Sequence, residues 1–158
     1  MSGSANATGT LAIDGTAIAI GNTAVLLTGP SGSGKSDLAL RMIDGGARLI
    51  SDDRVELVVE GDRLCCRAPG NIPPGLLGRI EARGIGIVPA PRTTGATPLQ
   101  WVVELVPAAE VERLPAAESR NFLGHAVPVL RLNAFEASTA VKLRLAAACG
   151  PGLIMGRE

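Results

Sequence analysis

Residues 24–53, AVLLTGPSGSGKSDLALRMIDGGARLISDD, decide the fold of this chain. The apolar run 24–28 predicts a buried strand. The segment 36–44 is rich in helix-forming residues and is followed by a Gly-Gly pair, which predicts a helix and its end. Between them, residues 29–36 fit the pattern GxxxxGK[ST] at every fixed position. The order strand, glycine-rich loop and helix is typical of α/β proteins that bind nucleotide phosphates.

The glycine-rich loop carries the groups that a chain of phosphates needs. Its glycines permit positive φ angles and let backbone N–H groups approach phosphate oxygens, and the helix that follows points its positive end at the anion. Lys35 can reach the β- and γ-phosphates, and Ser36 can offer its hydroxyl to Mg²⁺. The residues predicted to bind nucleotide are Gly29, Pro30, Ser31, Gly32, Ser33, Gly34, Lys35 and Ser36.

An Asp-Asp pair, Asp52 and Asp53, follows the short apolar run 47–50 soon after the predicted helix. A carboxylate at the end of a strand beside a phosphate loop can bind Mg²⁺ or accept a proton from an attacking hydroxyl. Asp is also common in solvated turns at strand ends. The spacing alone does not separate these two interpretations.

The rest of the chain shows a mixed α/β pattern without a repeat or a domain break. We predict a single domain over residues 11–158 and a flexible N-terminal tail over residues 1–10. Residues 11–20 predict either a short hairpin or one strand. Further along, the pattern predicts a hairpin over 55–68, a short helix over 76–83, strands over 84–88, 99–106 and 127–132, an irregular linker over 107–123, and a helix over 137–148.

The composition excludes several classes of function. The formal net charge is zero, so the basic footprint of a nucleic-acid-binding protein is missing, and aromatic residues make up only 2% of the chain, too few for base-stacking surfaces. No apolar run is long enough to span a membrane. The three cysteines fit reduced thiols rather than a disulfide framework. These features predict a cytoplasmic protein that acts on neither nucleic acids nor membranes.

Two motifs in order resemble those of the bacterial HPr kinase/phosphorylase family. The first is residues 29–57, GPSGSGKSDLALRMIDGGARLISDDRVEL, and the second is residues 81–88, EARGIGIV, which is similar to the family signature E-x-R-G-[LI]-G-[IL]. The resemblance runs from about residue 14 to residue 148 and is to the short form common in α-proteobacteria. It implies a P-loop kinase fold related to phosphoenolpyruvate carboxykinase, with a mixed β-sheet and flanking helices.

The same resemblance implies an activity. Members of the family use Mg-ATP to phosphorylate a serine of HPr, the phosphocarrier of the sugar phosphotransferase system. They also catalyse the reverse step, in which inorganic phosphate attacks phosphoserine and pyrophosphate is released. Hexamers are usual in the family, so the resemblance implies a homo-oligomer with HPr as its partner.

The resemblance also assigns roles to individual residues. Asp53 corresponds to the general base of the kinase step, and Lys35 would stabilise charge on the transferring phosphoryl group. Ser36 and Glu81, at the head of the second signature, would contact the metal. Arg113, in the stretch Glu112-Arg113-Leu114, resembles a later catalytic arginine of the family.

Asp14 stands where family members carry a histidine. An acid in place of an imidazole repels phosphate unless a cation intervenes. This replacement motivates an alternative function, a regulatory protein that senses nucleotide but is impaired in catalysis. A kinase of the same fold that acts on another substrate is a further alternative, because no short motif identifies the acceptor.

Overall fold

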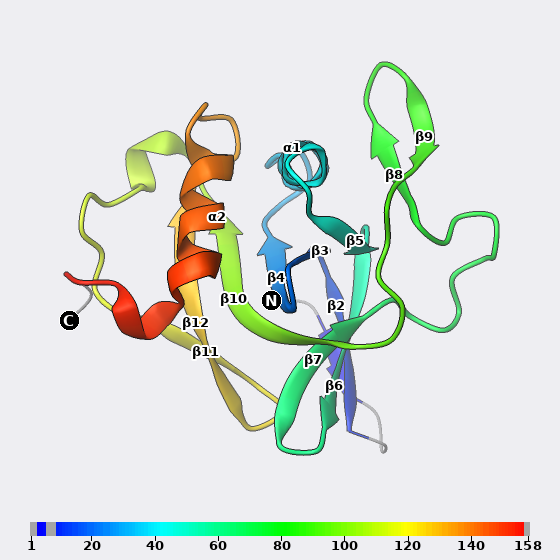
Figure 1. Cartoon of the computed structure of the whole chain (residues 1–158), viewed down its shortest axis with the longest axis horizontal. Helices are drawn as coiled ribbons and strands as arrows, with labels where there is room; N and C mark the ends of the chain where they lie inside the picture. Colours follow the sequence, from blue (N-terminus) through cyan, green and yellow to red (C-terminus); the bar gives the residue numbers. More distant parts are fainter. Residues whose placement is uncertain (1–2, 6–8, 157–158) are drawn as a thin grey trace.

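The computed structural model describes residues 3–5 and 9–156 (Figure 1). Within these residues, the chain forms one large mixed sheet, a separate two-stranded sheet and two α-helices. None of the described helices is long and apolar enough to cross a membrane. The strands are β1 Gly3–Ala5, β2 Thr10–Asp14, β3 Thr16–Ile20, β4 Thr23–Thr28, β5 Arg48–Ser51, β6 Arg54–Glu60, β7 Arg63–Arg67, β8 Arg79–Ala82, β9 Gly86–Pro89, β10 Thr97–Leu105, β11 Ser119–Phe122 and β12 His125–Leu132; the helices are α1 Lys35–Asp44, α2 Thr139–Cys149 and the short 3₁₀ turns η1 Ala108–Glu110 and η2 Pro151–Leu153.

The large sheet is parallel at its centre and antiparallel at its edges. Strand β10 pairs in parallel with β4 on one side and β12 on the other, and β3 and β5 add antiparallel strands beyond β4. The first residues of β10 also pair with β7, which joins the antiparallel strands β1, β2, β6 and β7 to the same sheet. Parallel strands collect their C-terminal ends at one edge, and ligands of α/β proteins bind at that edge. The ends of β4 and β10 therefore mark the position of the site.

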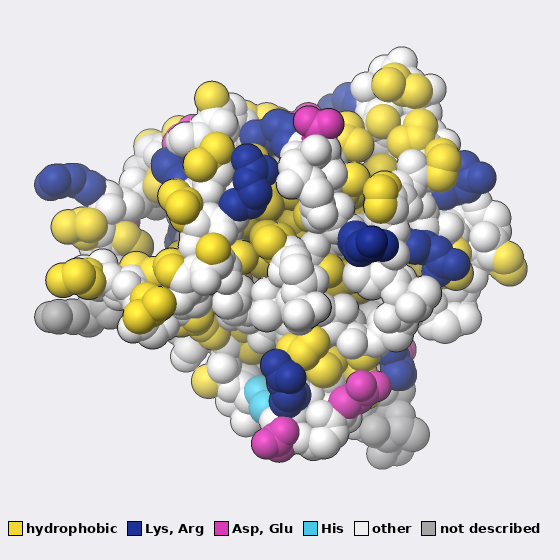
Figure 2. All heavy atoms as spheres, viewed as in Figure 1, with side chains coloured by type: hydrophobic (Ala, Val, Ile, Leu, Met, Phe, Trp, Pro, Cys, Tyr) yellow, Lys and Arg dark blue, Asp and Glu magenta, His cyan; other side chains and the backbone are white. Residues whose placement is uncertain are grey.

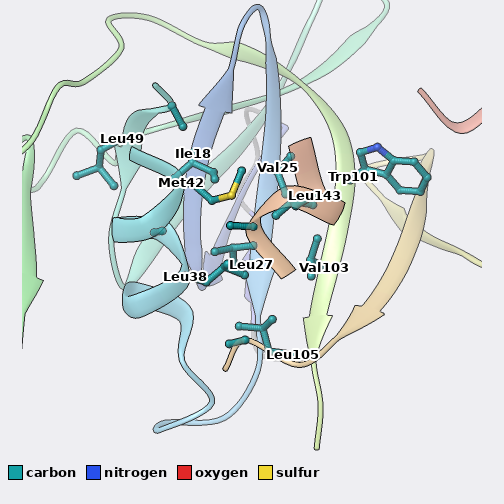
Figure 3. Packing of buried hydrophobic residues seen from close by; sticks show 14 of the residues in the cluster. Ile18, Val25, Leu27, Leu38, Met42, Leu49, Trp101, Val103, Leu105 and Leu143 are labelled. Carbon is teal, nitrogen blue, oxygen red and sulfur yellow. The ribbon is translucent and has the colours of Figure 1, made fainter. Parts of the chain in front are cut away.

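Alternating residues of the central strands divide the interior into two apolar clusters. Val25 and Leu27 of β4 face α1 and α2, while Leu26 faces the opposite side of the sheet. Figure 3 shows Leu38 and Met42 of α1 among side chains of β3 and β4, with Leu143 of α2 in the same cluster. This alternation is the period-two pattern of strands buried on both faces. The side chains on one face of the sheet pack against α1, and this packing holds α1 and the loop before it against the sheet.

Several sequence predictions about the fold are confirmed. The mixed α/β architecture, the strand over 24–28, the helix after the glycine-rich loop, the hairpin over 55–68 and the last helix are all present, with ends shifted by at most two residues. In addition, the structure buries Trp101 of β10 fully, and its indole N–H donates to the carbonyl of Ala146 over 3.2 Å. The strand predictions over 84–88, 99–106 and 127–132 correspond to β9, β10 and β12.

Four local predictions need correction. The helix predicted over 76–83 is wrong, because Arg79–Ala82 alternate between exposed and buried positions and form β8, which pairs with β9. The linker over 107–123 contains η1 and, at its end, β11. Residues 11–20 are neither a hairpin nor one strand, since β2 pairs with β6 and β3 pairs with β4.

The fourth correction concerns the predicted N-terminal tail. Residues 3–5 form β1 at the edge of the sheet, paired antiparallel with β2, and Thr10 begins β2. This part of residues 1–10 is therefore strand. Residues 1–2 and 6–8 of the predicted tail lie outside the described residues.

Candidate active site

The phosphate loop, residues 29–36, connects the end of β4 to the start of α1 at the carboxyl edge of the parallel strands. Gly34 precedes the helix with a φ of 96°, and a Cβ atom there would lie 2.6 Å from the Cβ of Ala134 and 2.9 Å from Cζ of Phe135. Only glycine fits this position, because both the conformation and the space forbid a side chain. The loop is thus held against the segment before α2.

Lys35 and Ser36 lie at the first turn of α1, where the helix presents its positive end. The Lys35 ammonium donates to the carbonyl oxygens of Gly29 and Pro30 over 2.7 and 3.1 Å, so it lies along the rim of the loop. The Ser36 hydroxyl donates to Oδ1 of Asp52 over 3.0 Å. This hydrogen bond directs the hydroxyl proton away from the loop and leaves the oxygen lone pairs available to a cation.

Asp52 has a role that the sequence analysis did not assign. It follows the end of β5, and its Oδ1 also accepts a hydrogen bond from the Thr16 hydroxyl over 2.8 Å. The two hydroxyl donors fix the carboxylate behind Ser36. Asp52 therefore serves as a positioning residue for Ser36.

Asp53 is the acid that faces the open side of the loop. Its backbone has a φ of 68°, a left-handed conformation that Asp adopts more readily than most residues, and its carbonyl accepts a hydrogen bond from the Gly15 N–H over 2.9 Å. Partial burial raises the pKa of the Asp53 carboxyl, the negative charges of Asp52 and Glu81 raise it further, and Lys35 opposes the shift. A raised pKa suits a carboxylate that must take up and release a proton.

Glu81 and Arg83 reach the loop from the β8–β9 hairpin. They line a cleft of about 390 Å³, the first cleft, together with Lys35, Asp53 and Phe135. The apolar side of this cleft is provided by Leu40 and Phe135. The structure thus brings together Lys35, Ser36, Asp53 and Glu81, which the sequence analysis had placed in one site.

A second cleft, of about 690 Å³, shares Ser31, Lys35 and Asp53 with the first. Asp14 lines it, and Arg54 Nη1 lies 2.8 Å from Asp14 Oδ1, so a guanidinium offsets the charge of this acid. Its far wall carries Glu104 and Arg120, which form an ion pair. No local motif signals this pair, because sheet pairing brings Glu104 of β10 and Arg120 of β11 to the loop.

Arg113 does not join these residues. It is exposed in the segment between η1 and β11, and it is not one of the described residues that line either cleft. The catalytic role that the resemblance gave to Arg113 stays a prediction.

The residues of the first cleft fit a magnesium nucleotide. Ser33 Oγ is the one buried side-chain polar atom, within the described part of the chain, that has no hydrogen-bond partner, and a phosphate oxygen at the loop would supply one. The described residues contain no group of three His, Cys, Asp or Glu side chains able to hold a metal by themselves. Mg²⁺ is commonly held by one or two protein oxygens together with phosphate oxygens and water. Ser36 and Glu81 match that requirement.

Residues 6–147 match the sequence model of the HPr Serine kinase C-terminal domain, which is most of the chain. This chain belongs to the HPr serine kinase C-terminal domain family. Its relatives include the HPr kinase/phosphorylase of Lactobacillus acidophilus, which is 38% identical over 116 residues, 68% of this chain and 35% of that protein. The HPr kinase/phosphorylase of Burkholderia cenocepacia is 39% identical over 99 residues, 58% of this chain and 30% of that protein. The chain spans about a third of the length of these curated relatives.

A solved structure shares the fold. The Hpr(Ser) kinase/phosphatase of Coxiella burnetii matches with a TM-score of 0.74 over 87% of this chain and 88% of that one, at 23% sequence identity. The predicted fold of the HPr kinase family, with a mixed sheet and flanking helices, is therefore confirmed.

Proposed function

We propose that this chain transfers the γ-phosphoryl group of Mg-ATP to a serine of the phosphocarrier protein HPr. The observation that carries the proposal is the position of Asp53, which lines both the first and the second cleft beside Lys35. A nucleotide held by the phosphate loop from one side and a hydroxyl entering from the other would meet at this carboxylate. Membership in the HPr serine kinase family supports HPr as the acceptor.

Each residue of the site then has a defined task. The loop N–H groups and Lys35 bind the phosphates, and Lys35 offsets the charge that spreads over the transferring group. Asp53 accepts the proton of the serine hydroxyl as its oxygen forms the bond to phosphorus. Ser36, held by Asp52, and Glu81 would hold Mg²⁺, which neutralises charge on the β- and γ-phosphates when bound.

The same residues support the reverse reaction. Inorganic phosphate would occupy the place of the departing nucleotide, and its oxygen would attack the phosphorus of phosphoserine. The bond from phosphorus to the serine oxygen breaks, Asp53 returns its proton to that oxygen, and pyrophosphate leaves. The raised pKa of Asp53 favours a group that can act as base in one direction and as acid in the other.

We further propose that the chain works as a homo-oligomer, by similarity a hexamer, in the cytoplasm with HPr as its partner. The alternative of a nucleotide sensor without catalysis rests on Asp14. The ion pair between Asp14 and Arg54 favours the kinase over that alternative, because it offsets the negative charge beside the phosphates.

The test is intact-mass spectrometry of HPr from the same organism after incubation with this protein, ATP and Mg²⁺. One added phosphate that is absent with Lys35→Ala and absent after chelation of Mg²⁺ is the expected result. An unchanged HPr mass, with ATP binding demonstrated separately, would favour the sensor or a kinase with another acceptor.

A further inference from the structure

The β8–β9 hairpin forms a two-stranded sheet of its own beside the large sheet (Figure 1). One face of the hairpin is anchored, since Ile80 is buried in the apolar cluster that contains α1. The other face is open, and there Glu81 pairs directly with Ile87 in the antiparallel register. A residue predicted to contact the metal and an exposed isoleucine therefore lie side by side on the same face.

Apolar side chains are concentrated around this open face. Ile87 is 58% exposed and Ile85, at the hairpin tip, is 82% exposed, and the preceding segment adds Leu76 and Leu77 at 50% and 37%. Ten large apolar side chains are exposed among the described residues, and four of them lie within the twelve positions 76–87. Figure 2 shows apolar side chains gathered over β8 and β9, with basic side chains below them. Exposed apolar residues gathered in this way mark interaction sites.

A groove of about 250 Å³ connects this patch to the reacting centre. It runs between the hairpin and the ends of β5 and β6, and its apolar lining includes Leu76, Leu77 and Ile87. Asp53 and Glu81 line the same groove. A partner protein bound on the patch would therefore lie next to Asp53, the carboxylate proposed to accept the serine proton.

The charged side chains of residues 71–95 are three exposed arginines, Arg79, Arg83 and Arg92, and one exposed acid, Glu81, so basic groups outnumber acidic ones around the patch. Arg79 and Arg92 are exposed, and neither forms an ion pair with any described residue. The Arg92 side chain passes over Gly78 at the base of the hairpin, where a Cβ atom would lie 2.4 Å from Cδ of Arg92. Guanidinium groups at an interface favour carboxylates on the partner. The rim of the patch thus selects an acidic surface.

We propose that Leu76, Leu77, Arg79, Ile85, Ile87 and Arg92 form the docking surface for the acceptor protein. From this surface we expect the acceptor to present apolar side chains next to its serine and carboxylates around them. A small molecule does not fit this role, because the tip residue Ile85 projects outward and can be covered only by a large partner. The inference rests on the proposed kinase function for the identity of the acceptor, HPr.

The test compares two double variants that remove matched apolar surface. Ile85→Ser with Ile87→Ser alters the docking surface, whereas Val141→Ser with Leu145→Ser alters exposed positions of α2 that are 49% and 64% exposed. Isothermal titration calorimetry measures the affinity for HPr, and steady-state kinetics measure KM for HPr and for Mg-ATP. We expect the hairpin variant to bind HPr ~10- to 100-fold more weakly and to raise the KM for HPr equally, with the KM for Mg-ATP unchanged. The α2 variant should match the wild type.

A charge reversal gives a second, independent readout. Arg79→Glu should weaken HPr binding by ~10-fold at low salt, and the loss should shrink as salt rises, because exposed charges are screened. Circular dichroism and thermal unfolding check that each variant folds.

The outcomes separate the docking surface from the proposed function. If the wild type binds HPr without phosphorylating it, and the hairpin variant loses this binding, the docking surface is supported and the kinase function is refuted. Phosphate transfer with equal KM for HPr in wild type and hairpin variant refutes the surface alone. Wild-type protein that neither binds nor phosphorylates HPr refutes both. A hairpin that joins copies of this chain, shown by an oligomer that the hairpin variant dissociates, also overturns the docking surface.

Discussion

The phosphate loop and the β8–β9 hairpin both bring charged side chains to Asp53, but the protein holds them in opposite ways. The loop is fixed between β4 and α1, and Gly34 packs against Ala134 and Phe135. The hairpin has one buried face and one open face, and it pairs with no strand of the large sheet. The tightly packed loop suits phosphate binding, because phosphoryl transfer requires the phosphates to be positioned accurately. The open region suits the recognition of a partner.

The largest expected effect concerns the charge of the loop. Lys35→Ala should reduce phosphate transfer by ~10³-fold or more, because the transferring group loses its cationic partner. The control is Lys142→Ala, which should leave the rate unchanged. Lys142 is an exposed residue of α2 whose Nζ lies 3.3 Å from Oε2 of Glu136. Initial rates at saturating ATP and HPr measure both. Equal rates for Lys35→Ala and wild type would remove the loop from the mechanism.

A matched pair of glycines tests how differently the two regions are packed. Gly34 of the loop and Gly84 of the hairpin have φ angles of 96° and 93°, but a Cβ atom clashes only at Gly34. Gly34→Ala should lower the free energy of unfolding by about 3 kcal/mol, from strain and overpacking together. Gly84→Ala should cost about 1 kcal/mol from backbone strain alone. Urea denaturation measures both, and equal losses would contradict the close packing of the loop.

The contribution of the hairpin to the electrostatics of the site is a smaller effect. Glu81 raises the pKa of Asp53, and Asp14 raises it less. Glu81→Gln should therefore lower the pKa of the Asp53 carboxyl, and Asp14→Asn should lower it by a smaller amount. Carboxyl chemical shifts, followed by NMR against pH in the metal-free protein, report this pKa. An unchanged titration in Glu81→Gln would show that the hairpin does not act on Asp53.

The smallest expected effect is on the pH dependence of the free energy of unfolding. Because the pKa of Asp53 is raised in the folded chain, its carboxyl binds a proton more readily there than in the unfolded chain. The free energy of unfolding therefore falls as the pH rises from the ordinary Asp range through the raised pKa. Asp53→Asn removes this loss and fits the left-handed backbone, so the variant should be slightly more stable than the wild type at neutral pH. At acidic pH the difference should disappear, and denaturant midpoints at the two pH values check the sign.

The sequence predicts the loop far better than the hairpin, and the reason is physical. The loop is local: its glycines, Lys35 and Ser36 are contiguous, and their spacing alone defines the chemistry. The first strand of the hairpin, β8, lies in the segment 76–83 that was predicted as a helix, because β8 has only four residues and too short an alternation to be recognised. Glu81 entered the predicted site through family resemblance rather than through its own pattern.

Residues whose partners are distant in sequence were the hardest to predict. Asp52 is oriented by Thr16, which lies 36 positions earlier, and no local motif signals that contact. The pair Glu104 and Arg120 depends on the order of strands in the sheet. The family resemblance assigned the proton-accepting role to Asp53, whereas the hydrogen bonds of Asp52 to Thr16 and Ser36 are seen only in the structure.

A single-turnover measurement on Asp53→Asn tests most directly whether Asp53, which lines both clefts, accepts the serine proton. We expect the rate of phosphate transfer from Mg-ATP to HPr to fall ~10²- to 10⁴-fold, while the affinities for Mg-ATP and HPr stay close to those of the wild type. A transfer rate equal to that of the wild type would show that Asp53 is not the base.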